Sequence, residues 1–495
     1  MEPDTVVIGS GVSGLTAALI LAKEGRRVLV LEQHSRPGGL MQNFRRGSLV
    51  FPTGVHRLGS LDEGQILWRY FKYLGVLDKL DLVRMSPEGF EEYCFPGLRF
   101  KVPHGHEPFR ERLHKYFPAH KAAVDRFFLD MERTISQFAL YNLHSKPEGW
   151  VKLDTRPLNG YLDELRCPPE LKAILTAINP SYGIPPASCP LHTHFLVMDS
   201  FLNSSWRVNE NTTPLAEAFV SSLKSHGGKI RCNALVEGIG CEEGRVDGVR
   251  LAGGEYIPAK LVLFTGHPRQ LLSLCPPGAF RPIFRTRLKD SCDTYGAFVT
   301  ALRWPREDCP LALCDSYIYN DWDTGKHYNQ SMTAGQSPGM VFCSALPSGT
   351  DTGHSVVAMI GMAANDMAPF ALSRIKARSE EYLAFKRSIA ARILEVVKNR
   401  WPETAASLKI VETCSPLTFR DYTLAPHGTA YGISKSVTSL RSSMFAPTTK
   451  IKDLFLAGQS IIQPGVLGAL ISGVHAGAVI LGHDYLVARI VKETQ

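Results

Sequence analysis

Thr5-Val6-Val7-Ile8-Gly9-Ser10-Gly11-Val12-Ser13-Gly14 is the stretch that predicts how the chain begins to fold. Residues 6–8 form a short apolar run, typical of a buried strand, and a segment of helical apolar periodicity follows the glycines. In such a GxGxxG pattern, Gly9 permits a tight turn, Gly11 lets the backbone approach a pyrophosphate, and Gly14 lets helix and strand pack closely. The stretch therefore predicts a strand, a glycine loop and a helix whose N-terminus faces a phosphate.

The next residues complete a strand-helix-strand unit. Gly25 is expected to end the helix, and residues 28–31 are a second apolar strand. Glu32 stands at the end of this strand, eighteen residues after Gly14, where its carboxylate can accept hydrogen bonds from a ribose diol. The unit predicts a bound dinucleotide, and by itself it leaves NAD and FAD open.

The composition is that of an ordinary globular enzyme. The chain has 495 residues, enough for about three domains of roughly 150 residues or for two large interleaved ones. Hydrophobic residues make up 44% and charged residues 21%, which excludes a disordered or collagen-like chain. The net charge of +8 is spread over a long chain, so we expect no nucleic-acid partner, although a weakly positive surface also suits anionic lipid.

The cysteines and the N-terminus indicate a reducing compartment. The 11 cysteines are spread singly, and even Cys309 and Cys314 have four residues between them, so neither a CxxC redox pair nor a zinc ribbon is expected. Residues 4–8 read as a strand rather than a signal peptide. The apolar stretch 465–482 carries His475 and reads as a buried helix, not a membrane span. The expected location is cytoplasmic.

Two segments after the fingerprint narrow the cofactor to FAD. Glu32-Gln33-His34-Ser35-Arg36-Pro37-Gly38-Gly39 resembles the acid and glycine-pair signature of FAD-dependent oxidoreductases in the amine oxidase and phytoene desaturase superfamily. Phe51-Pro52-Thr53-Gly54-Val55-His56-Arg57-Leu58-Gly59 is similar to the segment of carotenoid isomerases and retinol saturases in which a Gly-x-His lies close to the flavin. The resemblance implies that Gly54 and His56 lie near the flavin.

The C-terminal region carries the strongest resemblance. Residues 454–460, followed by Pro464-Gly465-Val466-Leu467-Gly468-Ala469, are similar to the final strand, loop and helix of this family, in which the helix N-terminus points at the flavin ring. The N–H groups at such a helix end stabilise the electron-rich reduced flavin. Upstream, residues 415–422 and 427–432 look like the segment that passes over the flavin ring.

A central block agrees with the resemblance, with one departure. Residues 214–264 read as a helix, a strand, a hairpin and a final strand, in the order of the family's return into the FAD domain, where the residue at Val236 touches the adenine through its backbone. Polyene-acting relatives usually carry a proline and glycine pair before this helix, whereas the present chain reads residues 205–214 as Ser-Trp-Arg-Val-Asn-Glu-Asn-Thr-Thr-Pro. The departure leaves the substrate in more doubt than the cofactor.

The resemblance implies non-covalent FAD, because Cys414 lies near the flavin segment without a matching attachment motif. NAD(P)H remains a candidate external electron donor. The residues expected to contact FAD are Gly9, Gly11, Val12, Ser13, Gly14, Glu32, Gln33, Arg36, Gly38, Gly39, Leu40, Gly54, Val55, His56, Val236, Gly266, Gly458, Gln459, Gly465, Val466 and Gly468.

These segments predict an α/β fold with a discontinuous Rossmann-like FAD-binding domain, formed by residues 1–75, 212–290 and 450–495. The insertions 76–211 and 291–449 are expected to form an α+β substrate-binding domain. Two helices with one apolar face are expected there, the first burying residues from Val124 to Phe138. The second is expected to bury Leu383, Ile389, Ile393, Leu394 and Val397 and to expose Lys376, Arg378, Lys386, Arg387 and Lys398 to solvent.

The leading functional hypothesis is an FAD-dependent oxidoreductase of the phytoene desaturase, carotenoid isomerase and retinol saturase type. It would reduce, desaturate or isomerise carbon–carbon double bonds of an apolar isoprenoid, carotenoid or retinoid-like lipid. The catalytic side chains are unknown; candidates by resemblance are His56, Arg57, His427 and Tyr431, each with a structural hydrogen-bonding role as the alternative. The rival hypotheses are an amine oxidase, which needs an aromatic cage that Tyr422 and Tyr431 would have to supply, and a flavin-containing polyene-binding protein without turnover.

Two further patterns complete the sequence analysis. His192 and His194 could be metal ligands on one face of a strand, but no carboxylate or cysteine is spaced to complete a site, so no metal is expected. Residues 281–289 hold Arg281, Arg285, Arg287 and Lys289 among three large apolar residues, a composition suited to peripheral membrane contact or to a solvated loop. The oligomeric state stays open.

Overall fold

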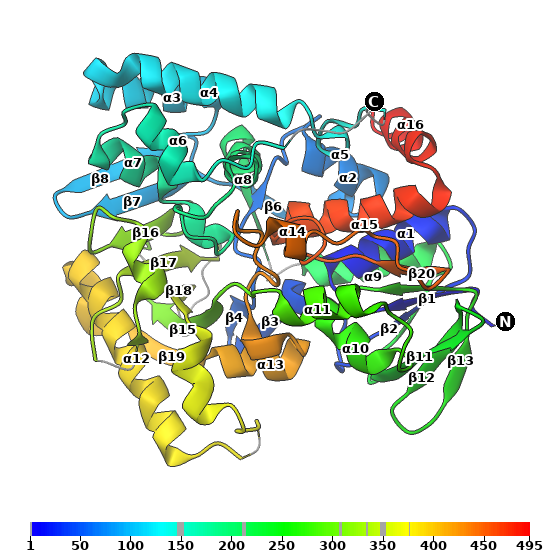
Figure 1. Ribbon diagram of the computed structural model, residues 1–495. Coiled ribbons are helices and arrows are strands. Elements are labelled where there is room, and N and C mark those ends of the chain that lie inside the picture. The colour runs from blue at the N-terminus through cyan, green and yellow to red at the C-terminus, as the bar shows by residue number, and fades with distance from the viewer. Residues whose placement is uncertain are drawn as a thin grey trace.

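The computed structural model describes residues 2–145, 153–209, 214–305, 309–332, 335–346, 353–375 and 377–495. A parallel sheet of five strands lies in the half of the molecule that holds both termini, and a seven-stranded sheet with its covering helices forms the other half (Figure 1). The first sheet has the order β10 (Lys229–Arg231), β2 (Val28–Leu31), β1 (Thr5–Ile8), β14 (Leu261–Phe264) and β20 (Leu454–Leu456). The predicted α/β fold class is confirmed.

The first sheet collects segments that are far apart in the chain. All of its strands come from the three segments that were expected to form the FAD domain. Beside it lies an antiparallel sheet of β11 (Val236–Glu242), β12 (Arg245–Leu251) and β13 (Tyr256–Pro258), which contains the expected hairpin at Glu243 and Gly244. The boundary placed between residues 211 and 212 lies outside the described residues.

Helices α1 (Val12–Lys23), α9 (Leu215–Ser225) and α15 (Gly465–Leu481) pack against one another beside the parallel sheet, with α1 between the other two. The residues of α1 from Ser13 to Ala22 are all buried, because other helices and the sheet cover it on several sides. The helix ends as expected: Glu24 is its last partly helical residue, and Gly25 follows in a left-handed conformation with φ of +77°.

The seven-stranded sheet belongs to the two insertions. Its order is β19 (Lys409–Cys414), β15 (Gly296–Trp304), β18 (His354–Met362), β17 (Met340–Ala345), β16 (Asp315–Tyr319), β7 (Glu91–Phe95) and β8 (Leu98–Val102), and only the pair β16 and β7 among these strands is parallel. The long helix α12 (Glu380–Arg400) packs on β15, β17, β18 and β19. Lys376, which was expected on the solvent side near this helix, lies outside the described residues.

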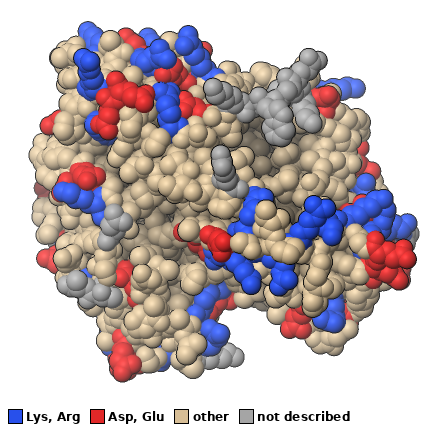
Figure 2. Space-filling view, in the orientation of Figure 1, with Lys and Arg blue, Asp and Glu red and all other residues tan. Residues whose placement is uncertain are grey.

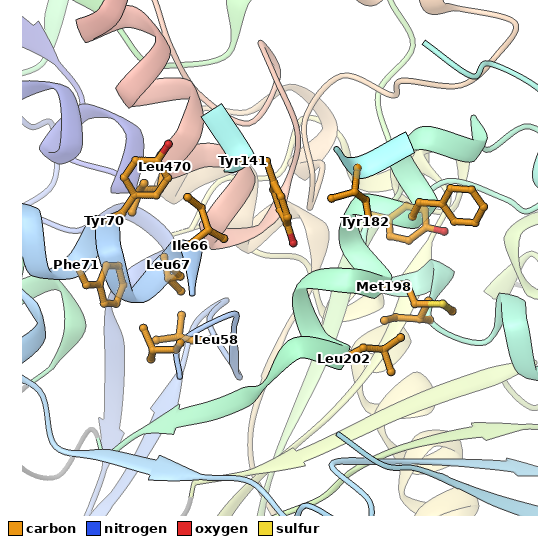
Figure 3. Close-up of a cluster of buried hydrophobic side chains, with 14 of the residues drawn as sticks. Leu58, Ile66, Leu67, Tyr70, Phe71, Tyr141, Tyr182, Met198, Leu202 and Leu470 are labelled. Atoms are coloured by element: carbon orange, nitrogen blue, oxygen red, sulfur yellow. The ribbon is translucent and has the colours of Figure 1, made fainter. Parts of the chain in front are cut away.

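A helical layer closes the other side of the insertion half. It contains α3 (His106–Tyr116), α4 (Lys121–Ile135), α5 (Ala139–Asn142), α6 (Leu158–Glu164), α7 (Pro169–Thr176) and α8 (Leu191–Asn203). Helix α2 (Ile66–Tyr73) belongs to the first segment expected to form the FAD domain and packs against the C-terminal helix α16 (His483–Glu493). Figure 3 shows side chains from α2, α5, α8 and α15 in one buried apolar cluster, with Leu470 of α15 near Tyr70 of α2. This cluster therefore joins the insertion half to the helix that follows the C-terminal glycines.

The structure corrects the expectation for His192 and His194. Both lie in α8, a helix, and not on a strand, and both are buried. His192 Nδ1 lies 2.8 Å from the Asp154 carbonyl oxygen, and His194 Nδ1 lies 2.8 Å from the Tyr182 hydroxyl. Within the described ranges, no three histidine, cysteine or acidic side chains are grouped as metal ligands. The two histidines thus have structural partners.

Further strands and helices complete the fold. They are β3 (Asn43–Arg46), β4 (Leu49–Pro52), β5 (Leu58–Gly59), β6 (Leu82–Arg84), β9 (Ser205–Val208), α10 (Leu271–Leu274), α11 (Pro282–Asp290), α13 (Pro416–Thr423) and α14 (Leu440–Ser443). Residues 282–290 thus form a helix, although a loop was one of the two expectations there. Across the described segments, no helix is long and apolar enough to cross a bilayer.

Candidate functional site

A single cavity of about 1120 Å³ lies where the fingerprint, the β3–β4 hairpin, α12, α13 and the start of α15 meet. Its volume slightly exceeds the upper end of the range of about 300–1,000 Å³ that is usual for small-molecule sites. One part is lined by the glycine loop, Glu32 and the C-terminal loop, and the other part by side chains of the insertion half. We call the second part the α12 lobe; its lining includes Phe44, Arg46, Val299, Arg378, Tyr382, Leu383, Lys386, Glu412, Cys414 and Phe419.

The fingerprint glycines have the roles that their spacing predicts. Gly9 has a φ of +100°, which favours glycine, and a Cβ built on Gly14 would lie 2.1 Å from the Gly9 carbonyl oxygen. A Cβ on Gly11, by contrast, would meet no atom within 4 Å, because Gly11 borders the cavity. The space beside Gly11 at the start of α1 is therefore open to a phosphate group, and the cradle fits a dinucleotide.

The C-terminal loop borders the same cavity. Gly465, the first residue of α15, lines the cavity with a φ of +80° and open space around its Cβ position. A Cβ on Gly468 would instead lie 2.6 Å from the Gln463 carbonyl oxygen, so Gly468 permits close packing of the loop and does not face the cavity. Gly458 donates its N–H to Ser472 Oγ of α15 over 3.0 Å, which fixes the strand end to the helix.

The structure brings most of the expected FAD-contacting residues to this cavity. Those that line it are Gly9, Gly11, Val12, Ser13, Glu32, Gln33, Arg36, Gly39, Leu40, Gly54, Val55, Val236, Gly266, Gly458, Gln459, Gly465 and Val466. Gly14, Gly38, His56 and Gly468 are not part of the lining. A Cβ on Gly38 would lie 2.4 Å from the Ala216 Cβ, so Gly38, like Gly14 and Gly468, permits close backbone packing behind the cavity. Contact of the lining residues with FAD stays a prediction.

Sequence reasoning missed Ser10, which lies between the fingerprint glycines. Ser10 N and Oγ both donate to the same oxygen of Glu32, the backbone donor over 3.0 Å, and Ser10 Oγ accepts from Gly38 N over 2.9 Å. Glu32 Oε1 accepts from His34 N over 2.8 Å. Ser10 thus joins the fingerprint to the glycine pair. The sequence offers little sign of this role of Ser10, because the GxGxxG pattern allows any residue at that position.

His56 lies behind the cavity lining and contacts the seven-stranded sheet. Its ring centroid is 5.7 Å from that of Phe342 on β17, and its Nδ1 is buried without a hydrogen-bond partner among the described residues. Burial lowers the pKa of His56 to about 4, so its imidazole is neutral at pH 7. A neutral imidazole can donate or accept one hydrogen bond but cannot supply a charge.

Arg57 is held in a buried network of ion pairs. It pairs with Glu91 and, over 2.9 Å, with Asp315, whose other oxygen pairs with Arg207 over 2.6 Å. Arg57 also donates to the Tyr317 hydroxyl over 3.2 Å. Burial raises the pKa of Glu91, against the opposing effect of Arg57. These contacts tie the loop after β4 to β7 and β16, which supports the structural alternative for Arg57.

The last two catalytic candidates differ in position. His427 is exposed, with a φ of +56°, and does not line the cavity. Tyr431 does line the cavity, with its ring 6.2 Å from that of Tyr295, and burial raises its pKa to about 12. Tyr422 is 51% exposed and its ring lies 5.4 Å from that of His34, near Glu32. Tyr422 and Tyr431 therefore have different ring partners.

The α12 lobe corrects the expected solvent face of this helix. Arg378 and Lys386 line the cavity and are only partly exposed, whereas Arg387 is exposed, as expected. Cys414 also lines the lobe, and burial raises its pKa to about 11, so the side chain is a neutral thiol at pH 7. Periodicity predicted the buried stripe of α12, including Ile389, but not that an adjacent face borders a cavity.

Comparisons with known proteins agree with this geometry. The family model of flavin containing amine oxidoreductases matches residues 12–481. All-trans-retinol 13,14-reductase of Homo sapiens is 26% identical over 97% of this chain and 85% of the relative. Phytoene desaturase (neurosporene-forming) of Cereibacter sphaeroides is 25% identical over 94% of this chain and 92% of the relative. A solved oxidoreductase from Methanosarcina mazei is 13% identical, with a TM-score of 0.63 over 95% of this chain and 98% of that structure, and shares the fold.

Proposed function

Since the chain belongs to the family of flavin containing amine oxidoreductases and is an FAD-dependent oxidoreductase, we propose that it reduces, desaturates or isomerises carbon–carbon double bonds of an apolar isoprenoid lipid. The observation that carries the proposal is the continuity of one cavity from the fingerprint into a lobe with apolar walls. Similarity over nearly the whole chain to a retinol reductase and a phytoene desaturase supports the same substrate class.

The residues of the cavity suit such chemistry. Bound FAD supplies hydride and electron transfer, so no acid-base triad is required. The residues around Gly11 and Gly465 place helix N-termini beside the cavity, where N–H groups favour negative charge. Tyr431 lines the cavity and its hydroxyl carries a proton at neutral pH, and a reduction needs one proton for each hydride. Tyr431 is therefore the side chain that we propose as proton donor.

An amine substrate is the less favourable alternative. A cationic amine would need an aromatic cage, and the two candidate tyrosines have different ring partners, His34 for Tyr422 and Tyr295 for Tyr431. In addition, Arg378 and Lys386 line the cavity and would repel a substrate ammonium group. An apolar or anionic substrate needs no aromatic cage and is not repelled by these two cations.

The proposal also includes peripheral contact with a membrane, where an apolar substrate is dissolved. Ile375, Tyr422 and Leu424 line the cavity and are 46%, 51% and 43% exposed, so its mouth has an apolar rim. Leu372, which is 92% exposed, belongs to the loop whose carbonyl groups at residues 371 and 373 accept hydrogen bonds from Arg420 of α13. Such a rim suits the collection of lipid from a bilayer surface.

The experiment follows the flavin absorbance of the holoenzyme without oxygen. After reduction with dithionite or NAD(P)H, an isoprenoid polyene should restore the oxidised spectrum if the enzyme reduces double bonds, and a saturated precursor should bleach the oxidised enzyme if it desaturates. Polyene isomers, analysed by chromatography, report isomerisation. Binding of the polyenes with no turnover in any of these assays would favour a binding protein, and acid precipitation that leaves the yellow colour in the pellet would contradict non-covalent FAD.

A further inference from the structure

The start of α12 and the residue before its N-cap border the cavity with two cations around an aromatic ring. Arg378, Tyr382 and Lys386 are spaced four residues apart and all line the α12 lobe. The guanidinium carbon of Arg378 lies 5.0 Å and the ammonium of Lys386 5.8 Å from the centroid of the Tyr382 ring. Tyr382 and Lys386 are four residues apart in α12 and so lie on one side of the helix, whereas Arg378 lies just before the N-cap residue Ser379.

The charges of the described residues in this lobe do not balance. Four cations lie here, Arg46, Arg378, Lys386 and Arg420, against two carboxylates. Glu412 is held by Arg46 over 2.7 Å, and Asp421 is shared between Arg378 and Arg420 over 2.6 and 2.7 Å. Two positive charges therefore remain in excess.

After this pairing, the excess charge lies on Lys386 and on Arg378, which shares Asp421 with Arg420. Lys386 donates to the Thr413 carbonyl oxygen over 2.7 Å, and no carboxylate among the described residues pairs with it. Burial lowers the pKa of Lys386, against the opposing effect of Glu412, which itself pairs with Arg46. Arg378 Nη1 is buried without a partner in the described chain, although Nη2 is paired with Asp421. An anion placed between them would supply the missing partners.

The lobe also has an apolar lining. Phe44, Val299, Leu383 and Phe419 line it, and the Phe44 ring stacks on Phe51 with centroids 5.3 Å apart. The lobe continues without a break to the fingerprint and Gly465. A ligand that fits both features has an anionic head and an apolar chain.

We propose that the α12 lobe binds the carboxylate or phosphate head of an amphiphilic substrate at Arg378 and Lys386, with the apolar chain directed along the cavity toward the flavin. This inference deepens the proposed function and rests on it for the identity of the lobe as the substrate side of the cavity. The same anion-binding groups could serve the phosphates of a pyridine nucleotide. The apolar wall favours the amphiphile, so we treat the nucleotide as the competing outcome.

The test measures equilibrium binding and needs no turnover. cis-Parinaric acid, a fluorescent polyene with a carboxylate head, and the alcohol of the same chain are titrated into the FAD-loaded enzyme. We expect the acid to bind roughly 10- to 150-fold more tightly than the alcohol, as expected for charge-assisted hydrogen bonds. Lys386→Gln and Arg378→Gln should each remove most of this preference and leave binding of the alcohol unchanged.

Arg387→Gln is the matched control, because Arg387 lies on the same helix, is exposed and pairs with the exposed Glu380. It should keep the preference for the acid. Equal binding of acid and alcohol to the unaltered enzyme would overturn the proposal, as would loss of the preference in Arg387→Gln. If NADPH displaces the alcohol from the unaltered enzyme but not from Lys386→Gln, and the acid is not preferred, the site binds the nucleotide.

The two proposals can fail separately. A clear preference for the acid, with no change of any polyene during turnover assays, would leave the anion site in place and refute the proposed function. Turnover of a polyene alcohol together with equal binding of acid and alcohol would support the proposed function and refute the anion site.

Discussion

Glu32 illustrates how one carboxylate can serve both the local fold and the ligand. It is only 7% exposed, lines the cavity, and accepts backbone hydrogen bonds from Ser10 and His34. Both of its oxygens are therefore already used to shape the loop. A ribose hydroxyl would add a further donor to an oxygen with remaining lone pairs.

We expect Glu32→Ala to weaken FAD binding about 10- to 150-fold, because charge-assisted hydrogen bonds are worth roughly 1.5–3 kcal/mol. Quenching of flavin fluorescence by the apoprotein measures the affinity. The FAD affinity of Glu32→Gln, which keeps one acceptor, should lie between those of the unaltered protein and of Glu32→Ala. Glu237→Ala, at an exposed position of β11, is the control, and an unchanged affinity of Glu32→Ala would remove this residue from the ribose.

Lys435 is a buried cation of another kind. It is 4% exposed and donates to the carbonyl oxygens of Ser443 and, over 2.6 Å, of Ser460, which lines the cavity. Burial, with a contribution from Arg287, lowers the pKa of Lys435 to about 7. Between about pH 7 and 10 the unfolded chain therefore binds a proton that the folded chain has released, so this group makes the unfolding free energy rise with pH.

Lys435→Met should reduce this increase of the unfolding free energy with pH. From pH 7 to 9.5, the gain in unfolding free energy should be about 2–3 kcal/mol smaller in the variant than in the unaltered protein, at roughly 1.4 kcal/mol per pKa unit. Urea denaturation of the holoenzyme at both pH values measures the difference. Lys452→Met, at an exposed site, should change nothing, and equal slopes in all three proteins would show that Lys435 titrates normally.

At the scale of elements, the contact between α1 and α15 brings the two ends of the chain to one site. A Cβ on Gly473 of α15 would lie 2.5 Å from the Ser13 carbonyl oxygen of α1, so the helices touch through backbone. Ser13 Oγ also donates to the Ala469 carbonyl oxygen. The two helix N-termini are thereby held beside one cavity, where both dipoles would favour negative charge on a bound ligand.

Gly465→Val tests the start of α15. The residue has a φ of +80° and its Cβ position is open toward the cavity, so valine adds strain and places its side chain in the ligand space. We expect loss of activity and altered flavin absorbance with an unchanged far-ultraviolet dichroism spectrum. Gly254→Val is the control, since Gly254 has a φ of +91° and open space in a hairpin away from the cavity. If Gly465→Val keeps full turnover, the flavin does not bind beside Gly465.

At the scale of the whole molecule, Lys and Arg side chains gather over α11 on the face shown in Figure 2. Arg281, Arg285 and Lys289 are exposed, and Ile283 is 71% exposed between them. Arg287 differs, since it donates to the Met444 carbonyl oxygen over 2.6 Å and packs on Phe445. Leu288 is buried as well, so the surface suited to lipid is smaller than the sequence indicated.

We expect salt-sensitive sedimentation of the protein with anionic liposomes, because exposed charges are screened beyond roughly 10 Å at 0.1 M salt. Replacement of Arg281, Arg285 and Lys289 by Gln should release the protein and leave the flavin spectrum unchanged. Replacement of three exposed cations elsewhere, Lys224, Lys229 and Lys452, controls for net charge. If the protein stays in the supernatant with anionic liposomes at low salt, α11 is an ordinary solvated surface.

The sequence by itself determined the dinucleotide unit and the family resemblance, and most of the residues that it predicted to contact FAD line the cavity. It could do so because the requirements are local: a tight turn at Gly9, an open approach at Gly11 and close packing at Gly14 depend on a few adjacent residues. The C-terminal glycines act in the same way at the start of α15, where Gly465 borders the cavity.

Only the tertiary structure decided which polar side chains face the cavity. Arg57 lies next to His56 in sequence, yet its environment consists of Glu91 and Asp315, which arrive from distant strands. Lys386 appeared to lie on a solvent face because helical periodicity identifies the buried stripe but not what covers the remaining surface. Those surroundings form when α12, α13 and the β3–β4 hairpin meet, and burial and charge pairing there depend on contacts between segments hundreds of residues apart.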